Sequence, residues 1–166
     1  MPALASMCRF QRAIAHNMTS SPATTKRSAG LDIGDKRIGI AVSDGLGMTA
    51  QPVGVVQRVS VKRDIEAVRS LLAPFELERL VAGLPLQMDG REGQQSTRTR
   101  AFADALGKAM GLEVVYQDER MTSVQSERIL IESGVRRDKR RTVIDKLAAT
   151  LILQAYLDSR RPVEDF

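Results

Sequence analysis

Carboxylate side chains stand at three points of the sequence where a folded sheet could bring them together. Asp32 lies within an apolar segment that is typical of a strand, and Asp118 and Glu119 end the last such segment. Asp145 stands near the start of the final amphipathic segment, which we expect to be a helix. Strand ends and helix starts meet at one edge of a parallel or mixed sheet, so these acids are candidates for one site. Carboxylates gathered in this way repel one another and require a cation.

The metal that such a site would hold follows from the side chains that the chain lacks. Its single cysteine and single histidine are Cys8 and His16, and neither type occurs from residue 30 onward. Thiolate and imidazole ligands, a thiol nucleophile and an imidazole base are therefore excluded from the folded part. Oxygen ligands alone suit hard divalent ions, so we predict Mg²⁺ or Mn²⁺ as the cofactor. Such ions can activate water and stabilise the leaving oxygen of a phosphodiester.

Each acid also has a structural interpretation. Burying an unpaired carboxylate within an apolar strand costs free energy, so a functional role for Asp32 is favoured over a role in the following turn. Asp145 could instead be a first-turn acid that complements the helix dipole, although Ala149 one turn later would let it approach a sheet closely. Asp118 and Glu119 could be the polar end of a strand before a capped helix.

A basic segment lies directly before Asp145. Residues 136–141 hold five cations and one acid, Asp138, so this loop would border the acidic site with a surface that attracts phosphate. The alternative is a solvated loop of charged residues. Aromatic side chains are few, with four Phe, two Tyr and no Trp, so we expect contacts with the nucleic-acid backbone rather than base stacking. The predicted phosphate-binding residues of this segment are Arg136, Arg137, Lys139, Arg140 and Arg141, and Arg91, Arg98 and Arg100 around a Gly-rich loop could extend the surface.

The elements that position these residues are predicted from the spacing of apolar side chains. Alternating apolar residues and turn glycines predict three short strands that begin at residue 28, the third at 53–59, in an antiparallel meander. A later apolar run predicts a buried strand at 80–84, and a further strand is predicted at 113–117. The predicted helices cover 65–72, 96–110, 122–133 and the segment from Ile144 to Ala155, with caps at Ser96 and Thr122. The order βββαβαβαα predicts an α/β fold with a mixed five-stranded sheet flanked by helices.

The length of the chain and the distribution of its charge indicate how many domains it has and where they begin. Its 166 residues are enough for one domain, and no apolar run approaches the roughly 20 residues that span a bilayer, so a membrane protein is excluded. The net charge of +5 comes mostly from the first 29 residues, which hold four basic residues and no acid. We predict a leader at 1–27, a domain at 28–160 and a tail at 161–166. The leader is typical of a disordered extension or an early start codon, and its Arg-rich and Ser-rich composition also fits a transit peptide.

Four motifs together resemble one known family. They are LDIGDKRIGIAVSD at 31–44, GLPLQMDG at 83–90, DERMTS at 118–123 and IDKLAATLILQAYLD at 144–158. In this order they closely resemble the YqgF/RuvX family, a bacterial branch of the RNase H-like nucleases related to the Holliday-junction resolvase RuvC. The resemblance spans residues 28–158 and implies an RNase H-like fold. It also implies a cytoplasmic nuclease that processes the 5′ end of precursor 16S ribosomal RNA, and a junction-resolving activity has been proposed for some members.

The resemblance also implies roles for single residues. The predicted metal ligands, all of them acids of the motifs, are Asp32, Glu119 and Asp145. The DER motif contributes an acidic pair to the catalytic site and does not decide whether Asp118 or Glu119 faces the metal. Arg37 and Arg120 match the motif arginines and are expected to pair with phosphate or with these acids.

Three functions other than RNA processing follow from the same residues. The first keeps the fold and the chemistry and makes a DNA junction the substrate, in which case a homodimer with two-fold symmetry is expected rather than a monomer. The second is a non-catalytic nucleic-acid-binding module, in which the basic segment would matter and the acids would not. The third is an actin-like ATPase, whose first phosphate motif resembles the DxG of the first strand, but one domain of this length cannot supply the two that such enzymes need. Expected partners are structured RNA or branched DNA, and a ribosomal precursor particle that presents the substrate.

Overall fold

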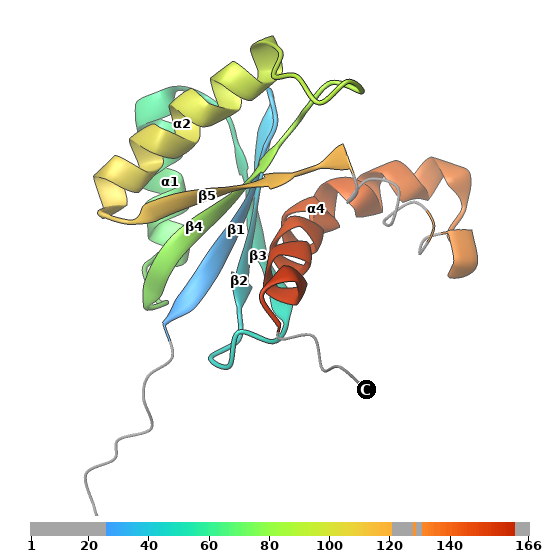
Figure 1. Ribbon diagram of the computed structural model, residues 1–166, viewed down its shortest axis with the longest axis horizontal. Helices are drawn as coiled ribbons and strands as arrows, with labels where there is room; N and C mark the ends of the chain where they lie inside the picture. The colour runs from blue at the N-terminus through green and yellow to red at the C-terminus, as the bar shows by residue number, and fades with distance from the viewer. Residues whose placement is uncertain (1–25, 121–127, 129–130, 162–166) are drawn as a thin grey trace, which may run out of the picture.

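A mixed five-stranded sheet forms the centre of the computed structural model, which describes residues 26–120, 128 and 131–161, without the side chains of 141–146. The strands are β1 (Arg27–Ile33), β2 (Arg37–Ser43), β3 (Ala50–Gln57), β4 (Leu77–Leu84) and β5 (Glu113–Asp118). They lie in the order β3-β2-β1-β4-β5, with β1 in the middle (Figure 1). β2 pairs antiparallel with β1 and β3, whereas β4 pairs parallel with β1 and β5. This topology confirms the predicted α/β fold with an RNase H-like sheet.

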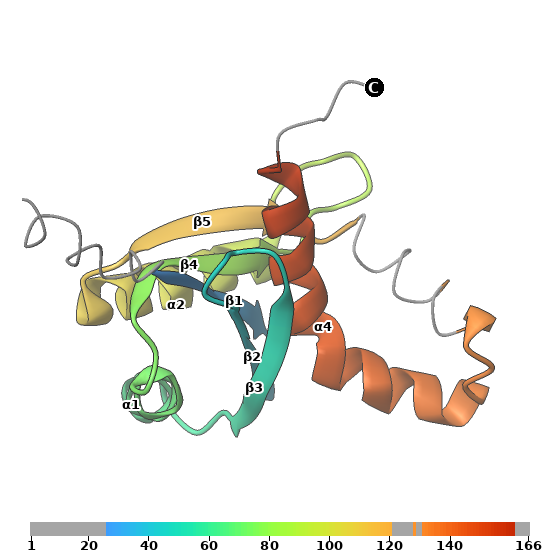
Figure 2. The same cartoon turned by 90° about the horizontal axis from the view of Figure 1, so that it is seen from below.

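Helices cover both faces of the sheet. The described part of the chain contains α1 (Val61–Leu72), α2 (Gln94–Met110) and α4 (Arg137–Ser159). α1 and α2 lie on one face and α4 lies on the other, as the two perpendicular views show (Figures 1 and 2). None of these helices is long and apolar enough to cross a bilayer.

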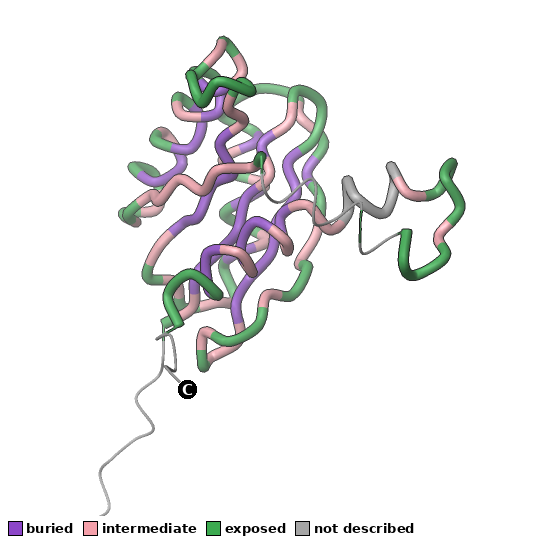
Figure 3. The backbone as a smooth tube through the Cα atoms, turned by 45° about the vertical axis from the view of Figure 1, so that its right-hand side comes forward, coloured by how far each residue is buried: buried purple, intermediate pink, exposed green. Residues whose placement is uncertain are grey.

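Alternation of side chains along the strands produces two cores. Leu31 and Leu80 point to the face of α1 and α2, where they pack with Val68 and Phe102. A smaller cluster on the opposite face joins the sheet to α4 through Val81, Ile152, Leu153 and Tyr156. Figure 3 shows the buried residues concentrated along the middle of the sheet. The middle strand is therefore covered on both sides, which holds Asp32 in a rigid part of the fold.

The third strand begins and ends earlier than predicted. β3 covers Ala50–Gln57 rather than 53–59, because Asp44 closes the preceding turn by accepting a hydrogen bond from the N–H of Met48 at 2.8 Å. At the other end, the N–H of Val59 donates to the buried carboxylate of Asp64 at 2.9 Å. Val59 therefore belongs to the start of α1, whose N-cap is Ser60.

The predicted cap of the next helix is also wrong. α2 begins at Gln94 after Gly93, and Ser96 is fully buried within its first turn. The hydroxyl of Ser96 donates to the carbonyl of Pro85, so this serine fastens α2 to the end of β4 instead of capping the helix. The helix predicted at 122–133 lies mostly outside the described residues, and so does the predicted leader, apart from Lys26 and Arg27.

Gly30 allows α4 to approach β1 closely, which gives a first prediction. A Cβ atom at this position would lie 2.6 Å from Cβ of Leu153 and 2.8 Å from the carbonyl oxygen of Ala149. Gly30→Ala is therefore expected to lower the free energy of unfolding by about 1–3 kcal/mol, as overpacking of a core does. Urea unfolding measures this, with Gly45→Ala as the control because nothing lies within 4 Å of its Cβ. An unchanged midpoint for Gly30→Ala would show that α4 is not seated against Gly30.

Candidate active site

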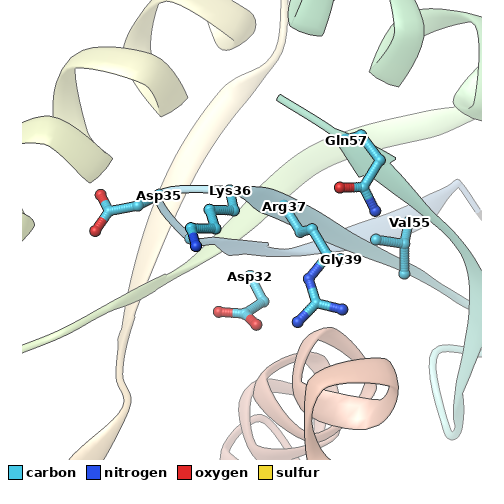
Figure 4. Close-up of a pocket in the computed structure, with 8 residues that line it drawn as sticks. Asp32, Asp35, Lys36, Arg37, Gly39, Val55 and Gln57 are labelled. Atoms are coloured by element: carbon cyan, nitrogen blue, oxygen red, sulfur yellow. The ribbon is translucent and has the colours of Figure 1, made fainter. Parts of the chain in front are cut away.

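Asp32 is held in the middle strand, on the face that α4 covers. It pairs with Gly39 of β2, and both residues line a cavity of about 500 Å³. Lys36, Arg37 and Gln57 line the same cavity. In Figure 4 the carboxylate of Asp32 and the guanidinium of Arg37 point to the same side, toward α4. Two carboxylates, Asp32 and Asp35, and two cations thus surround a hollow large enough for part of a nucleotide.

Glu119 follows the last residue of β5 and reaches back over β4. Its N–H donates to the carbonyl of Leu84 at 3.3 Å, which extends the pairing of β4 and β5. Its side chain lies against the backbone of Gly83, where an added Cβ atom would overlap the carboxylate and lie 2.9 Å from Cγ of Glu119. The pKa of Glu119 is raised to about 7, first by burial and then by the charges of Asp32 and Asp118. The carboxylates of Asp32 and Glu119, which lie far apart in the sequence, are therefore close enough to repel each other.

Asp118 is directed to a different partner. Its carboxylate accepts hydrogen bonds from Nη2 of Arg120 at 2.7 Å and from Nε at 3.0 and 3.1 Å. It also accepts one from the N–H of Arg120 at 2.9 Å, and these bonds lower the pKa of Asp118. Because successive residues of a strand point to opposite sides, only one member of the acidic pair can face the cavity. The geometry favours Glu119 as that member, with Asp118 as the residue that holds Arg120.

Asp145 lies in α4 at the level of Asp32. The carbonyl of Ala149 meets the backbone at Gly30, and α4 runs opposite to β1. From Ala149 back to position 145 the helix advances by about 6 Å. From Gly30 forward to Asp32 the strand advances by about 7 Å in the same direction. The helix backbone therefore brings position 145 near the strand position of Asp32, while the side chain of Asp145 lies outside what the structure describes.

The acids at this site fit a hard divalent cation. Two of the three predicted ligands, Asp32 and Glu119, are brought together, and the third belongs to the side chains that are not described. Within the described ranges no group of three or more His, Cys, Asp or Glu side chains could hold a metal ion. Both described candidates are oxygen donors of like charge, and a cation between them would relieve the repulsion that raises the pKa of Glu119.

The two motif arginines and Arg91 lie in two places, because Arg120 lies beside Gly90 of the loop that holds Arg91. Arg37 lines the cavity beside Asp32, and Arg120 is bound to Asp118. Arg91 is mostly exposed and pairs with Asp89 at 2.6 Å in the loop after β4. The structure therefore brings Arg37 into the cavity and leaves Arg91 on a neighbouring surface.

The basic segment 136–141 was predicted to be a loop, and this prediction is wrong. The segment forms the N-cap and the first residues of α4. Asp138 in the first turn complements the helix dipole, and Nε of Arg140 donates to the carbonyl of Val135 at 2.7 Å, so both favour a helix. This part of α4 projects beyond the sheet (Figures 1 and 2). The side chain of Arg141 is not described. The exposed cations of the segment are Arg136, Arg137 and Lys139.

Sequence reasoning missed three residues of the site. Gly83 makes room for Glu119, and its only signal is a glycine within an apolar strand, which often marks the close approach of another group. Lys36 belongs to the first motif, but neither the spacing nor the resemblance gave it a role. Gln57 lies on the edge strand β3, and no feature of the sequence distinguishes it.

The raised pKa of Glu119 predicts a pH-dependent stability of the metal-free protein. Its carboxylate has an ordinary pKa near 4.5 when the chain unfolds and about 7 when it is folded. Folding is therefore penalised as pH rises through this window, by about 3 kcal/mol once the carboxylate is fully ionised. In EDTA, Glu119→Gln should be more stable than the wild type at pH 8, and this advantage should vanish at pH 4. Urea unfolding at the two pH values measures the difference, with the exposed Glu66→Gln as control; a difference independent of pH would contradict the buried carboxylate.

Comparisons with known proteins place the chain among relatives that match along most of their length. A family model described as "RuvX: Holliday junction resolvase" matches residues 26–159. A Myxococcus xanthus protein named "putative pre-16S rRNA nuclease" is 48% identical over 136 residues, which are 82% of this chain and 90% of the relative. A protein of the same name from Halothermothrix orenii is 47% identical over 132 residues, covering 80% of this chain and 94% of the relative.

Solved structures with a similar arrangement include two Holliday-junction resolvases and sugar kinases of the ROK family. RuvC of T. thermophilus in complex with a Holliday junction matches with a TM-score of 0.47 and 16% identity, covering 81% of this chain and 95% of that one. The fowlpox virus resolvase in complex with Holliday junction DNA matches with a TM-score of 0.45 and 14% identity, covering 80% and 97%. The family assignment depends on the sequence matches, which are far stronger. With a family model that spans 26–159 and relatives nearly half identical to it, the chain belongs to the RuvX family, as its four motifs predicted.

Proposed function

We propose that this protein is a metal-dependent nuclease that hydrolyses phosphodiester bonds in structured RNA and processes the 5′ end of pre-16S rRNA in the cytoplasm. The observation that carries the proposal is the meeting of Asp32 and Glu119 beside a cavity that also holds Lys36 and Arg37. The relatives that match most of the chain are named for this substrate. Both lines of support point to a hydrolase that acts on a polyanion.

The residues divide between holding a cation and holding the substrate. Asp32 and Glu119, with Asp145 from α4, would hold Mg²⁺ or Mn²⁺. When bound, a pair of such ions supplies an activated water and neutralises the charge on the leaving oxygen. Lys36 and Arg37 would attract and orient the phosphate, and the exposed cations at the start of α4 would add backbone contacts. Gln57 on the edge of the sheet would contact the nucleotide beside the scissile bond.

A DNA junction is the second candidate substrate. It is favoured by the description of the family model, which names a Holliday junction resolvase. A junction presents two equivalent strands, so this reading requires a homodimer on the substrate, whereas RNA processing needs only a monomer. A non-catalytic binding module is disfavoured, because two adjacent carboxylates repel phosphate and the burial of Glu119 costs stability.

Cleavage of two substrates side by side tests the proposal. A pre-16S 5′-leader RNA and a four-way DNA junction are each incubated with the full chain in Mg²⁺, Mn²⁺ or EDTA. Cleavage of the RNA that requires a divalent metal ion is the expected result. Cleavage of the junction alone would favour the resolvase. If neither is cut, the assay is repeated with a ribosomal precursor particle that presents the leader. No cleavage of that particle would overturn the nuclease and favour a non-catalytic nucleic-acid-binding protein.

A further inference from the structure

A second polar pocket lies at the opposite end of the sheet from Asp32 and Glu119. The starts of β1 and β4, the turn after β2 and the C-terminal end of α4 meet there (Figure 1). It has a volume of about 310 Å³. Ser28 of this pocket and Asp32 alternate along β1 on the face of α4, so both sites open on the same face of the sheet. Its polar lining residues, one of them acidic, are Lys26, Ser28, Ser43, Glu78, Tyr156, Arg160 and Arg161.

Two guanidinium groups converge on one buried phenol in this pocket. Tyr156 is only 6% exposed, and its oxygen accepts hydrogen bonds from Nη1 of Arg79 at 2.7 Å and from Nη1 of Arg160 at 2.6 Å. These two bonds occupy the lone pairs of the phenol, so its own O–H remains as a donor. Among the residues whose side chains the structure describes, no acceptor for that O–H is found. Bonds from two cations also polarise the O–H and make it a stronger donor.

The positive charge around the phenol is only partly balanced. Nε of Arg79 lies 3.3 Å from Oε1 of Glu78 but is buried and makes no hydrogen bond to a described residue. Arg161 is 3.5 Å from Asp158, and no ion pair of Arg160 occurs within the described part of the chain. The C-terminal end of α4 adds about half a negative charge, which is less than the charge of the surrounding cations. An oxyanion that accepts from the phenol and the guanidinium groups would complete this arrangement.

We propose that this pocket binds a phosphate of the same nucleic-acid strand that the active site cleaves, and this inference therefore rests on the proposed function. From position 145 to Tyr156 the helix rises by about 17 Å. Successive phosphates of a B-form DNA strand are about 3.4 Å apart along the axis, and those of an A-form RNA strand are closer, so the bound phosphate would lie several nucleotides from the scissile bond. Cations lie on both sides of position 145: Arg136, Arg137 and Lys139 at the start of α4, and Arg160 and Arg161 directly after its last residue. The helix thus matches a substrate that continues on both sides of the cleavage site.

Binding without cleavage tests the pocket separately from the nuclease. The affinity of the full chain for a fluorescent RNA hairpin is measured in EDTA by anisotropy over a range of salt concentrations. Arg160→Ala should weaken binding about tenfold and reduce the slope of log K against log salt by about 0.7–0.9, the amount for one phosphate contact. Tyr156→Phe keeps the buried ring and should weaken binding about threefold with little change in slope. Arg63→Ala, an exposed change on α1 across the sheet, is the matched control and should change neither.

Inorganic phosphate provides a direct probe of the pocket. Phosphate should shift the NMR signals of the Tyr156 ring in the full chain, and the shift should be lost in Arg160→Ala. Unchanged affinity and slope in both variants would overturn the proposal even if the protein cleaves RNA. If the two variants bind RNA more weakly and the wild type cleaves nothing, the phosphate pocket would be supported and the proposed nuclease function would be overturned. If phosphate shifts Tyr156 only in a chain that ends at Arg161, carboxylates of residues 162–166 occupy the pocket and the substrate role is overturned.

Discussion

Asp32→Asn is expected to lower the rate of phosphodiester cleavage by about a thousandfold or more. The substitution removes the charge that Asp32 and Glu119 would use together to hold a divalent cation. Charge stabilisation by a bound cation contributes several kcal/mol to the transition state, and about 4 kcal/mol corresponds to a factor of a thousand in rate. Binding of the substrate should stay the same or improve, because a carboxylate that repels phosphate is gone.

Single-turnover cleavage and anisotropy on the same RNA separate these two effects. Asp44→Asn is a matched control, because it makes the same chemical change in an exposed turn at the other end of β2. An asparagine there can still accept the hydrogen bond from Met48, so its cleavage rate should equal that of the wild type. Cleavage by Asp32→Asn at the wild-type rate would rule out a metal-based mechanism at this site.

Gly83→Ala is expected to reduce cleavage about a hundredfold without altering any charged residue. Its new Cβ would overlap the carboxylate of Glu119 and lie 2.5 Å from Cδ1 of Ile152. Because Ile152 is packed between α4 and the sheet, Glu119 is the side chain that must move. A ligand displaced by about 1 Å can cost a factor on the order of 10² in rate. Metal affinity, measured by calorimetry with Mn²⁺, should fall together with the rate.

A second glycine separates this effect from a loss of stability. A Cβ at Gly107 would lie 2.5 Å from Cγ2 of Val114, so Gly107→Ala overpacks the interface of α2 and β5 on the opposite face of the sheet. Both variants should lose about 1–3 kcal/mol in the free energy of unfolding. At a temperature where both are folded, Gly107→Ala should cleave like the wild type and Gly83→Ala should not. Equal losses of activity would show that Gly83 acts only through stability.

The acidic pair of the DER motif shows where prediction from sequence ends. The apolar residues at 114–116 were enough to predict the last strand and to place Asp118 and Glu119 at its end. Which of the two faces the cavity depends on the register of β5 against β4, where Leu84 pairs with Asp118, and on the pairing of Asp118 with Arg120. The prediction that the basic segment 136–141 is a loop was wrong for a related reason. A run of charged residues has no apolar period, and its helix continues from the packed part of α4.

By itself, the sequence determined the chemistry and the order of the elements. A folded part without cysteine or histidine can offer a metal only oxygen, and the change from a period of two to one of 3.6 predicts a sheet joined by helices. The tertiary structure alone decided which groups meet. Glu119 lies over Gly83, near enough to Asp32 for their charges to interact, and Tyr156 accepts hydrogen bonds from two arginines at the far end of the sheet. Such contacts join residues far apart in the chain, so they depend on strand register and helix seating, which local patterns do not contain.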